Sequence, residues 1–206
     1  EWGSREVVAL DRAGRVGRII DSVGRFGALS LDPGGRRLAI EFDFDLYRFD
    51  LSRGFLTRLT RSPELEIAPV WSRDGHTLYY ASEGRRNFDV FRRSADGGGA
   101  ETLVYSSGHD MYPSSVSPDG TALLFTEWAP VGDLRVLSLD GHGPPKSMTR
   151  TLSTEEHGTY SPNGRWIAYQ SDESGDDQVY LQRAGEGSWP DRIQVSRNGG
   201  ANPRWD

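Results

Sequence analysis

The sequence predicts an all-β protein, a β-propeller built from four-stranded antiparallel blades. Three observations support this fold class: a repeat of about 44 residues, short segments that alternate apolar and polar residues, and tight-turn dipeptides between those segments. No segment has sustained helical periodicity, and the 25 glycines suit a chain with many turns. The 206 residues are enough for a single domain with a sizeable core.

The repeat is visible in two columns of residues. An aromatic or aliphatic residue, here called the marker residue, precedes each tight turn at spacings of 40 to 45 residues, and an aspartate recurs every 44 residues. Such a period is typical of four-stranded propeller blades. We expect the marker residues to pack between blades. They are Leu31, Trp71, Val116, Tyr160 and Trp205, and the aspartates are Asp45, Asp89, Asp133 and Asp177, with Gln178 as an alternative to the last.

Each repeat is expected to contain four strands, A to D. In the second repeat they are residues 68–72, 77–82, 88–94 and 100–104. Glycine, aspartate and asparagine between strands A and B supply the positive φ that a tight turn needs. These turns are Gly34-Gly35, Asp74-Gly75, Asp119-Gly120 and Asn163-Gly164. We expect one domain over residues 1–206, with blades at 28–60, 68–104, 113–149 and 157–196.

The two ends of the sequence look like parts of a blade. Residues 7–20 resemble strands C and D, and residues 202–206 resemble strand A of a last blade. The sequence therefore predicts about five blades, closed by shared terminal strands, or an incomplete six-bladed ring. It begins without methionine and stops inside a repeat, so we expect a processed product or a piece of a longer protein.

Composition excludes several classes of function. The net charge is −6 and the basic residues are not clustered, which argues against nucleic-acid binding. The absence of cysteine removes disulfides, thiolate metal sites and thiol nucleophiles. The apolar runs are too short to span a membrane, and no signal peptide is evident. The motifs of serine hydrolases, P-loop proteins and kinase catalytic domains are also missing.

The repeated motifs resemble those of a known family. The patterns W-S-x-D-G-x-x-L-x-Y-x-S from Trp71 and S-P-D-G-x-x-L-L-F from Ser117, with R-L-T ending at Thr60, resemble the WD-like repeat of TolB-like β-propellers. They look especially like the propeller regions attached to bacterial serine/threonine protein kinases. The resemblance extends from about Val7 to Trp205. It implies an extracytoplasmic, periplasmic interaction protein or a sensor region joined to a kinase.

The polar segments before each marker residue are the best candidates for a ligand site. They differ between repeats, and they begin the inner strands that converge on the central channel. We expect these residues to gather at one mouth of the channel. Three interpretations are open there: a solvated polar funnel, a site for a divalent ion, and a site for a peptide or protein. The residues are Glu66, His109, Asp110, Glu156 and His157. No catalytic residue, resident metal or cofactor is assigned.

Other candidates have simpler structural explanations. The aspartate column is expected to accept hydrogen bonds from loop N–H groups, because ligands spread over separate blades cannot share one ion. The acidic loop 171–178 lacks EF-hand spacing and is expected to be solvated. Trp128 and Trp189 lie in expected loops, where they either anchor a partner or fold onto the blade edge.

The function that the sequence favours is a non-catalytic scaffold that binds a protein or peptide. One alternative is a metal-dependent hydrolase or lyase that works in the channel. Another is the gating propeller of a serine peptidase without its catalytic domain. If core and site are separate, Glu156→Ala and His157→Ala leave the fold intact, whereas Trp71→Ala unfolds it.

Overall fold

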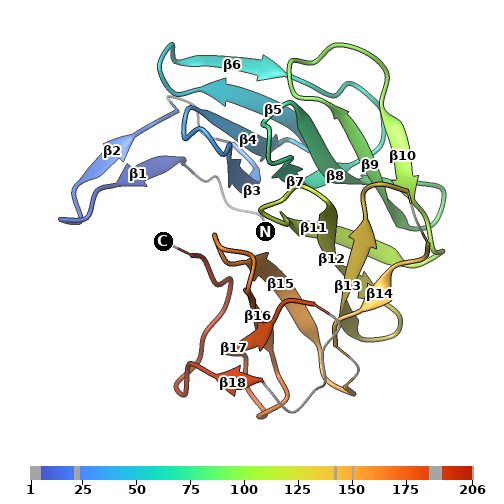
Figure 1. Ribbon diagram of the computed structural model, residues 1–206. Helices are drawn as coiled ribbons and strands as arrows, with labels where there is room; N and C mark the ends of the chain where they lie inside the picture. The colour runs from blue at the N-terminus through green and yellow to red at the C-terminus, as the bar shows by residue number, and fades with distance from the viewer. Residues whose placement is uncertain (1–5, 21–23, 142, 150, 186–191, 206) are drawn as a thin grey trace.

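The computed structural model describes residues 6–20, 24–141, 143–149, 151–185 and 192–205. All regular secondary structure in these ranges is β-strand, which confirms the predicted all-β class. These ranges contain no helix, and therefore none that is long and apolar enough to cross a membrane. Four four-stranded antiparallel sheets and one two-stranded hairpin follow one another along the chain, and the four-stranded sheets are the predicted blades (Figure 1).

The strands of each blade are consecutive in sequence. The hairpin consists of β1 (Val8–Leu10) and β2 (Val16–Arg18), and the first blade of β3 (Phe26–Leu31), β4 (Arg37–Phe42), β5 (Asp45–Asp50) and β6 (Phe55–Arg58). The second blade is formed by β7 (Glu66–Trp71), β8 (Thr77–Glu83), β9 (Phe88–Ser94) and β10 (Thr102–Tyr105). The third has β11 (Asp110–Val116), β12 (Ala122–Trp128), β13 (Gly132–Ser138) and β14 (Lys146–Ser147). The fourth has β15 (Glu155–Tyr160), β16 (Trp166–Ser171), β17 (Gln178–Arg183) and β18 (Ile193–Gln194).

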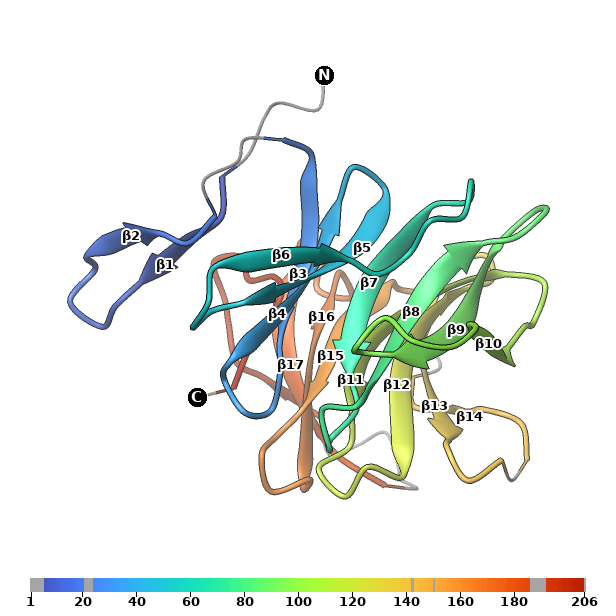
Figure 2. The same cartoon turned by 90° about the horizontal axis from the view of Figure 1, so that it is seen from above.

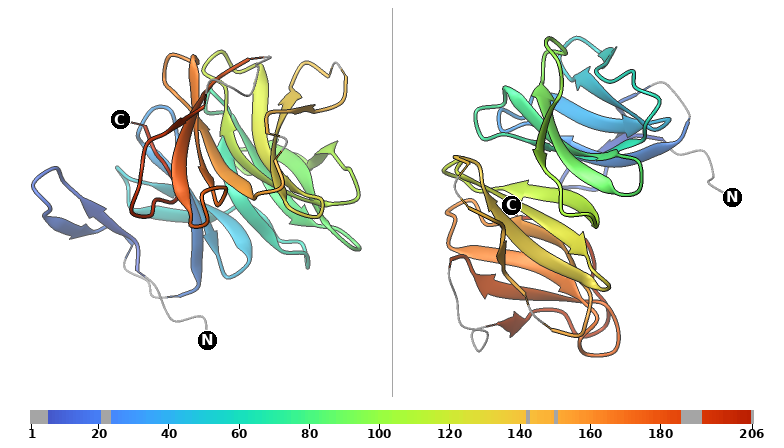
Figure 3. Two further views of the ribbon diagram at one scale, coloured as in Figure 1. Left: turned by 90° about the horizontal axis from the view of Figure 1, so that it is seen from below. Right: turned by 90° about the vertical axis from the view of Figure 1, so that its right-hand side faces the viewer.

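The blades are arranged around a common centre with their first strands innermost (Figure 1). Strand β7 contacts β3 on one side and β11 on the other, and β11 also contacts β15. The hairpin β1–β2 projects away from the blades (Figures 2 and 3), and among the described strands it pairs only within itself. The C-terminal segment lies on the same side of the molecule as the hairpin (Figure 1). Among the described residues, no strand pairing joins the two terminal segments into a shared fifth blade.

The A–B turns form as their dipeptides predict. In the second blade, the Ser72 hydroxyl donates to Asp74 Oδ1 at 2.6 Å and accepts the N–H of Thr77 at 2.9 Å. The third and fourth blades repeat this arrangement with Ser117 and Ser161. The glycine that ends each turn has φ between 64° and 78°, a conformation that glycine adopts with little strain.

The marker residues pack between blades where a preceding blade is present. Trp71 is buried, and its indole Nε1–H donates to the carbonyl of Ser30 in the first blade at 2.9 Å. Trp205 makes the equivalent bond to the carbonyl of Thr159 at 3.0 Å. Leu31, in contrast, is 56% exposed. Its predicted burial is wrong because no blade in the described chain precedes the first one.

Every inner strand contains a β-bulge. The register shifts between Phe26 and Leu29, between Ile67 and Val70, between Pro113 and Ser115, and between Glu156 and Thr159. A bulge places an extra residue in one strand and turns side chains away from simple alternation. The bulges therefore decide which polar residues face the centre of the molecule.

Candidate functional site

The four inner strands and residues 202–205 surround a central cavity of about 1060 Å³. Apolar and aromatic side chains form much of the wall, and a few polar groups interrupt it. The apolar lining includes Leu29, Pro69, Val70, Trp71, Tyr112, Pro113, Val116, Trp128 and Trp205. The charged and amide lining consists of Asp110, Glu156, His157, Asn202 and Arg204.

The bulge in β15 brings two consecutive polar side chains to the cavity. Glu156 and His157 both line it, although neighbours in a regular strand point to opposite faces. His157 has φ of 55°, and Ala68 and Asn202 hold the equivalent place before their own marker residues with φ of 53° and 50°. A positive φ is uncommon for residues other than glycine. The strand start is thus shaped to expose Glu156 and His157 together.

Three of the five predicted site residues line the cavity. Asp110 Oδ1 accepts a hydrogen bond from the Phe88 N–H at 2.9 Å. Glu156 Oε1 accepts one from Gln170 Nε2 at 3.1 Å and lies 3.6 Å from His157 Nε2. Each carboxylate is therefore held in place by a neighbouring strand or blade.

Glu66 is placed differently. Its side chain is fully buried and is not part of the cavity wall. Its Oε1 accepts a hydrogen bond from the Ser62 hydroxyl. The nearby Thr60 hydroxyl donates to Asp45 instead. Glu66 Oε2 therefore has no hydrogen bond among the described residues. Burial raises the pKa of the Glu66 carboxyl, and the hydroxyls beside it offset part of that rise.

The position of Glu66 belongs to the packing between blades. The residue five places before the marker residue is at most 5% exposed in every blade. It is Phe26, Glu66, Met111 and Glu155 in blades one to four. Counting back from the marker residue therefore shows that Glu155, and not Glu156, is the counterpart of Glu66. Like Glu66, Glu155 accepts a hydroxyl hydrogen bond, from Thr151, and burial raises the pKa of its carboxyl.

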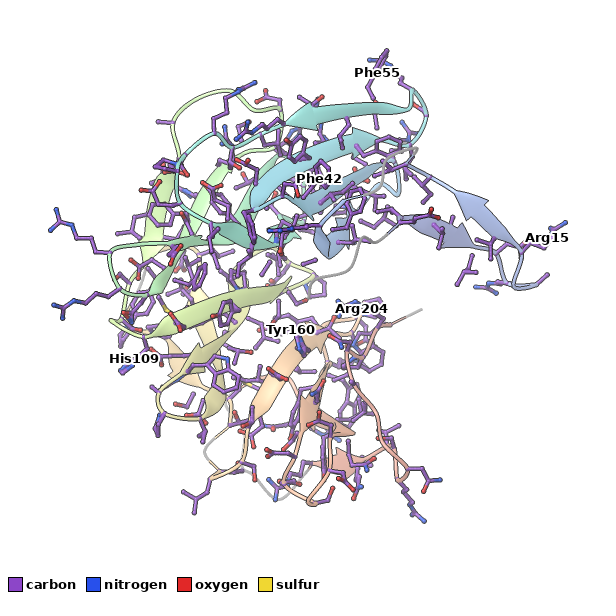
Figure 4. The ribbon with its side chains drawn as sticks, turned by 180° about the vertical axis from the view of Figure 1, so that it is seen from behind. Arg15, Phe42, Phe55, His109, Tyr160 and Arg204 are labelled. Atoms are coloured by element: carbon purple, nitrogen blue, oxygen red, sulfur yellow. The ribbon has the colours of Figure 1, made fainter. Side chains whose placement is uncertain are left out.

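His109 is also outside the cavity wall. It is exposed in the loop before β11, and Figure 4 shows it at the periphery of the molecule. The cavity instead includes residues that were not predicted. Tyr112 alternates with Asp110 on β11, and this alternation was a usable signal. Arg204 lies beside Tyr160 near the inner strands (Figure 4), and both line a second cavity of about 380 Å³.

Of the two tryptophans predicted in loops, the structure describes Trp128. Trp128 is the last residue of β12, is 37% exposed and lines the cavity rather than covering the blade edge. Trp189 lies outside the described residues.

In the aspartate column, Asp45 is held by different donors from those predicted. Asp45 accepts from Arg58 Nη2 at 2.6 Å and from the Thr60 hydroxyl at 3.2 Å, and that hydroxyl accepts the N–H of Leu46. In the fourth blade Gln178 takes this place and accepts from the Ser196 hydroxyl at 2.7 Å. The expected loop N–H donors are thus replaced at these positions by side chains from the outer strand and the segment after it.

The acidic loop 171–178 also has internal partners. Asp172 Oδ1 accepts the Thr154 N–H at 2.9 Å, and Glu173 pairs with Arg192 at 2.7 Å. Across the described residues, no group of three or more His, Asp or Glu side chains is placed to hold a metal ion.

The sequence is similar to several curated bacterial proteins, although no family model matches it. It is 31% identical over 137 residues to an uncharacterized protein of Agrobacterium fabrum strain C58, a match that covers 61% of this chain and 46% of that protein. It is 27% identical over 138 residues to the Tol-Pal system protein TolB of Helicobacter pylori strain 26695, covering 66% and 33%. The matches thus span less than half the length of these relatives.

Solved structures share the fold. A putative TolB from Agrobacterium tumefaciens has a TM-score of 0.77 at 20% identity, covering 85% of this chain and 64% of that one. TolB from Acinetobacter baumannii has a TM-score of 0.80 at 22% identity, covering 93% and 48%. An oligogalacturonate lyase in complex with manganese reaches 0.67 at 15% identity, covering 93% and 58%. The chain therefore has a TolB-like propeller fold.

Proposed function

We propose that this chain is a non-catalytic propeller domain that binds a protein or peptide in the cavity between its inner strands. The observation that carries the proposal is the cavity itself, which is about 1060 Å³ and lined by aromatic and aliphatic side chains with a few polar groups. Sites that bind organic ligands have this composition, because apolar walls supply affinity and isolated polar groups fix orientation.

The rigidity of the wall supports the same proposal. The carboxylates of Asp110 and Glu156 are held by hydrogen bonds from Phe88 and Gln170, and Trp71 joins the first two blades through its indole N–H. A preorganised wall reduces the entropy that is lost when a ligand binds. The likeness to proteins named TolB adds support at the level of fold.

The metal-dependent hydrolase or lyase is the main alternative. The lyase among the fold neighbours was solved with manganese, but the described part of this chain offers no cluster of three metal-ligating side chains. The peptidase alternative assigns the chemistry to another domain, so the described cavity would act as a passage. A binding site requires neither a cluster of metal-ligating side chains nor a second domain.

The larger context forms part of the proposal. We place the domain outside the cytoplasm, as an interaction or sensor region of a longer bacterial protein, and a kinase-attached propeller is one such arrangement. The complete reading frame of the parent gene tests this placement. A parent without an export signal or membrane anchor would contradict it, and one with a peptidase domain would favour the gating alternative.

Selection of peptides from a random display library tests binding directly. We expect enriched peptides whose affinity falls at least about tenfold in Trp128→Ala or Tyr112→Ala, because buried aromatic contacts dominate most interfaces. Leu103→Ala is the control, since Leu103 is 52% exposed on outer strand β10, away from the cavity wall. Thermal melts verify that each variant is folded. If no peptide is enriched, or if binding ignores both aromatic variants, the proposal is wrong.

A further inference from the structure

We propose that the cavity holds a cationic group of its ligand, a lysine or arginine side chain, against Asp110, Glu156 and the aromatic rings of Tyr112 and Trp128. This inference rests on the proposed function and names the chemistry that the cavity recognises. It starts from a charge imbalance in the cavity wall.

Four shielded carboxylates elsewhere in the chain are paired with arginine, whereas the buried Glu66 and Glu155 accept hydroxyl hydrogen bonds instead. The pairs are Asp32–Arg37 at 3.0 Å, Asp45–Arg58 at 2.6 Å, Glu127–Arg135 at 3.0 Å and Glu173–Arg192 at 2.7 Å. Asp110 and Glu156 differ, because among the described residues neither forms an ion pair with arginine or lysine. His157 near Glu156 is a cation only when protonated. The cavity wall thus carries two carboxylates without an ion-pair partner against one arginine, Arg204, whose described hydrogen bond goes to the Pro203 carbonyl.

The two carboxylates also keep hydrogen-bonding capacity. Each uses one oxygen for an internal bond, Oδ1 of Asp110 to the Phe88 N–H and Oε1 of Glu156 to the Gln170 amide. No described donor meets Oδ2 of Asp110 or Oε2 of Glu156. The internal bonds fix the orientation, and the second oxygens remain available to a ligand donor. A charge-assisted bond to an ammonium or guanidinium group suits such an oxygen.

Aromatic side chains stand beside these carboxylates. Asp110 pairs in register with Trp128 across β11 and β12, and Tyr112 pairs with Thr126, so the four residues form one cross-strand patch. All four line the cavity. The faces of Trp and Tyr rings attract cations, and tryptophan does so most strongly. A carboxylate next to aromatic side chains that line a cavity matches the head of a basic side chain and its apolar stem.

The indole of Trp128 has space to lie there because residue 132 is glycine. A Cβ at Gly132 would stand 3.3 Å from the Trp128 ring, 3.1 Å from the Thr154 methyl and 3.2 Å from the Thr126 methyl. Thr154 precedes β15, so the indole lies at the junction of the third and fourth blades, on the side from which Glu156 reaches the cavity. Trp128 is thus the register partner of Asp110, and its ring lies near Thr154, two residues before Glu156.

The test uses small probes that carry only the proposed group. The probes are the N-acetyl N-methylamides of lysine and arginine, and that of norleucine is the neutral match for lysine. Each is titrated into the isotope-labelled chain while backbone amide and tryptophan indole resonances are followed by NMR. Trp128→Phe assigns the relevant indole. We expect saturable shifts with at least one cationic probe and at least fivefold weaker binding of norleucine.

Charge variants locate the contact. We expect Asp110→Asn and Glu156→Gln each to weaken the cationic probe about two- to fivefold, the range of partly exposed charge pairs. Both substitutions keep the oxygen that accepts the internal bond. Glu64→Gln makes the same charge change at an exposed loop position outside the cavity wall and should have no effect. Added salt should weaken binding to the unsubstituted chain and should affect a variant that combines Asp110→Asn with Glu156→Gln less.

The outcomes separate this inference from the proposed function. Equal binding of norleucine and the cationic probes, no saturable shift with any probe, or insensitivity to both charge variants overturns the cation site. Peptides that bind through Trp128 without a basic residue would keep the proposed function and remove this inference. Failure of the display selection removes the proposed function itself. Should Asp110→Asn unfold the chain, Glu156→Gln alone decides the result.

Discussion

Replacement of Glu66 by glutamine should stabilise the protein at neutral pH. The Glu66 side chain is fully buried, and its Oε2 has no hydrogen bond in the described chain. An unsatisfied buried polar atom costs about 1–3 kcal/mol of folding free energy. Glutamine keeps an oxygen for the Ser62 hydroxyl and replaces Oε2 with an amide donor that can reach Thr60 or Asp45, which lie nearby. We therefore expect a gain of about 1–3 kcal/mol near pH 7.

The gain should depend on pH in a defined direction. Burial raises the pKa of Glu66 in the folded state above its ordinary value of 4.5, and the nearby carboxylates of Asp45 and Glu101 add to the rise. The folded chain therefore binds this proton more tightly than the unfolded chain does. Its contribution to stability is present below the ordinary pKa and is lost as pH rises through the folded pKa. Glutamine mimics the protonated acid, so the advantage of the variant should shrink towards pH 4.

Thermal or denaturant unfolding of both proteins from pH 4 to pH 8 measures this effect. For a chain of this size the expected gain at pH 7 corresponds to roughly 2–12 °C in Tm. Glu155→Gln tests the equivalent position of the fourth blade, where the carboxyl is also buried. Glu64→Gln, on an exposed side chain, should change little. A Glu66→Gln variant that is less stable than the parent across the whole pH range would refute the reasoning.

Three further predictions follow from packing and from the cavity. Trp71→Ala should lower the free energy of unfolding by about 3–5 kcal/mol, because it removes a buried indole that bridges two blades. Glu156→Ala and His157→Ala should each change it by no more than about 1 kcal/mol, as measured by chemical denaturation. Gly158→Ala should cost about 1–3 kcal/mol, because the added Cβ would stand 2.7 Å from Leu124, while Gly17→Ala meets nothing within 4 Å and serves as control. Millimolar Mn²⁺ should leave Tm unchanged within error. A saturable rise would instead favour the metal-dependent alternative.

The fold could be predicted because its rules are local and are repeated. Each Asp-Gly, Asn-Gly or Gly-Gly pair fixes a turn through a positive φ, and the alternating segments beside it can bury only one face at a time. Trp71 shows how far this logic extends, since its burial between blades follows from its place in the repeat. Leu31 shows its limit. A marker residue is buried only where a preceding blade packs against it, and the repeat alone does not show whether that blade is present.

The cavity could be predicted only in part, because bulges re-aim the inner strands. Strict alternation does not place Glu156 and His157 together in one wall, yet both line the cavity through the shift between Glu156 and Thr159. The non-glycine residues that adopt positive φ at these bulges, among them Ala68 and His157, carry no sequence signature of that conformation. Polarity alone also wrongly predicted Glu66 as a site residue. Its position, five residues before the marker residue, is a packing position, as the buried Met111 at the same place in the third blade shows.

The position five residues before the marker residue also links packing to the proposed site. In β11 the buried position is Met111, which packs with Tyr79, Val90 and Phe125 at an apolar junction between the second and third blades. Its neighbours Asp110 and Tyr112 both line the cavity. A fully buried residue between two cavity residues fixes the strand from behind, so their positions are set by core packing. Strand β15 has no such apolar anchor, because the buried residue at this position is Glu155, which carries a carboxyl group. The proposed cation-binding contacts on β11 are therefore preorganised by apolar packing. Those proposed on β15 depend on the hydrogen bond between Gln170 and Glu156.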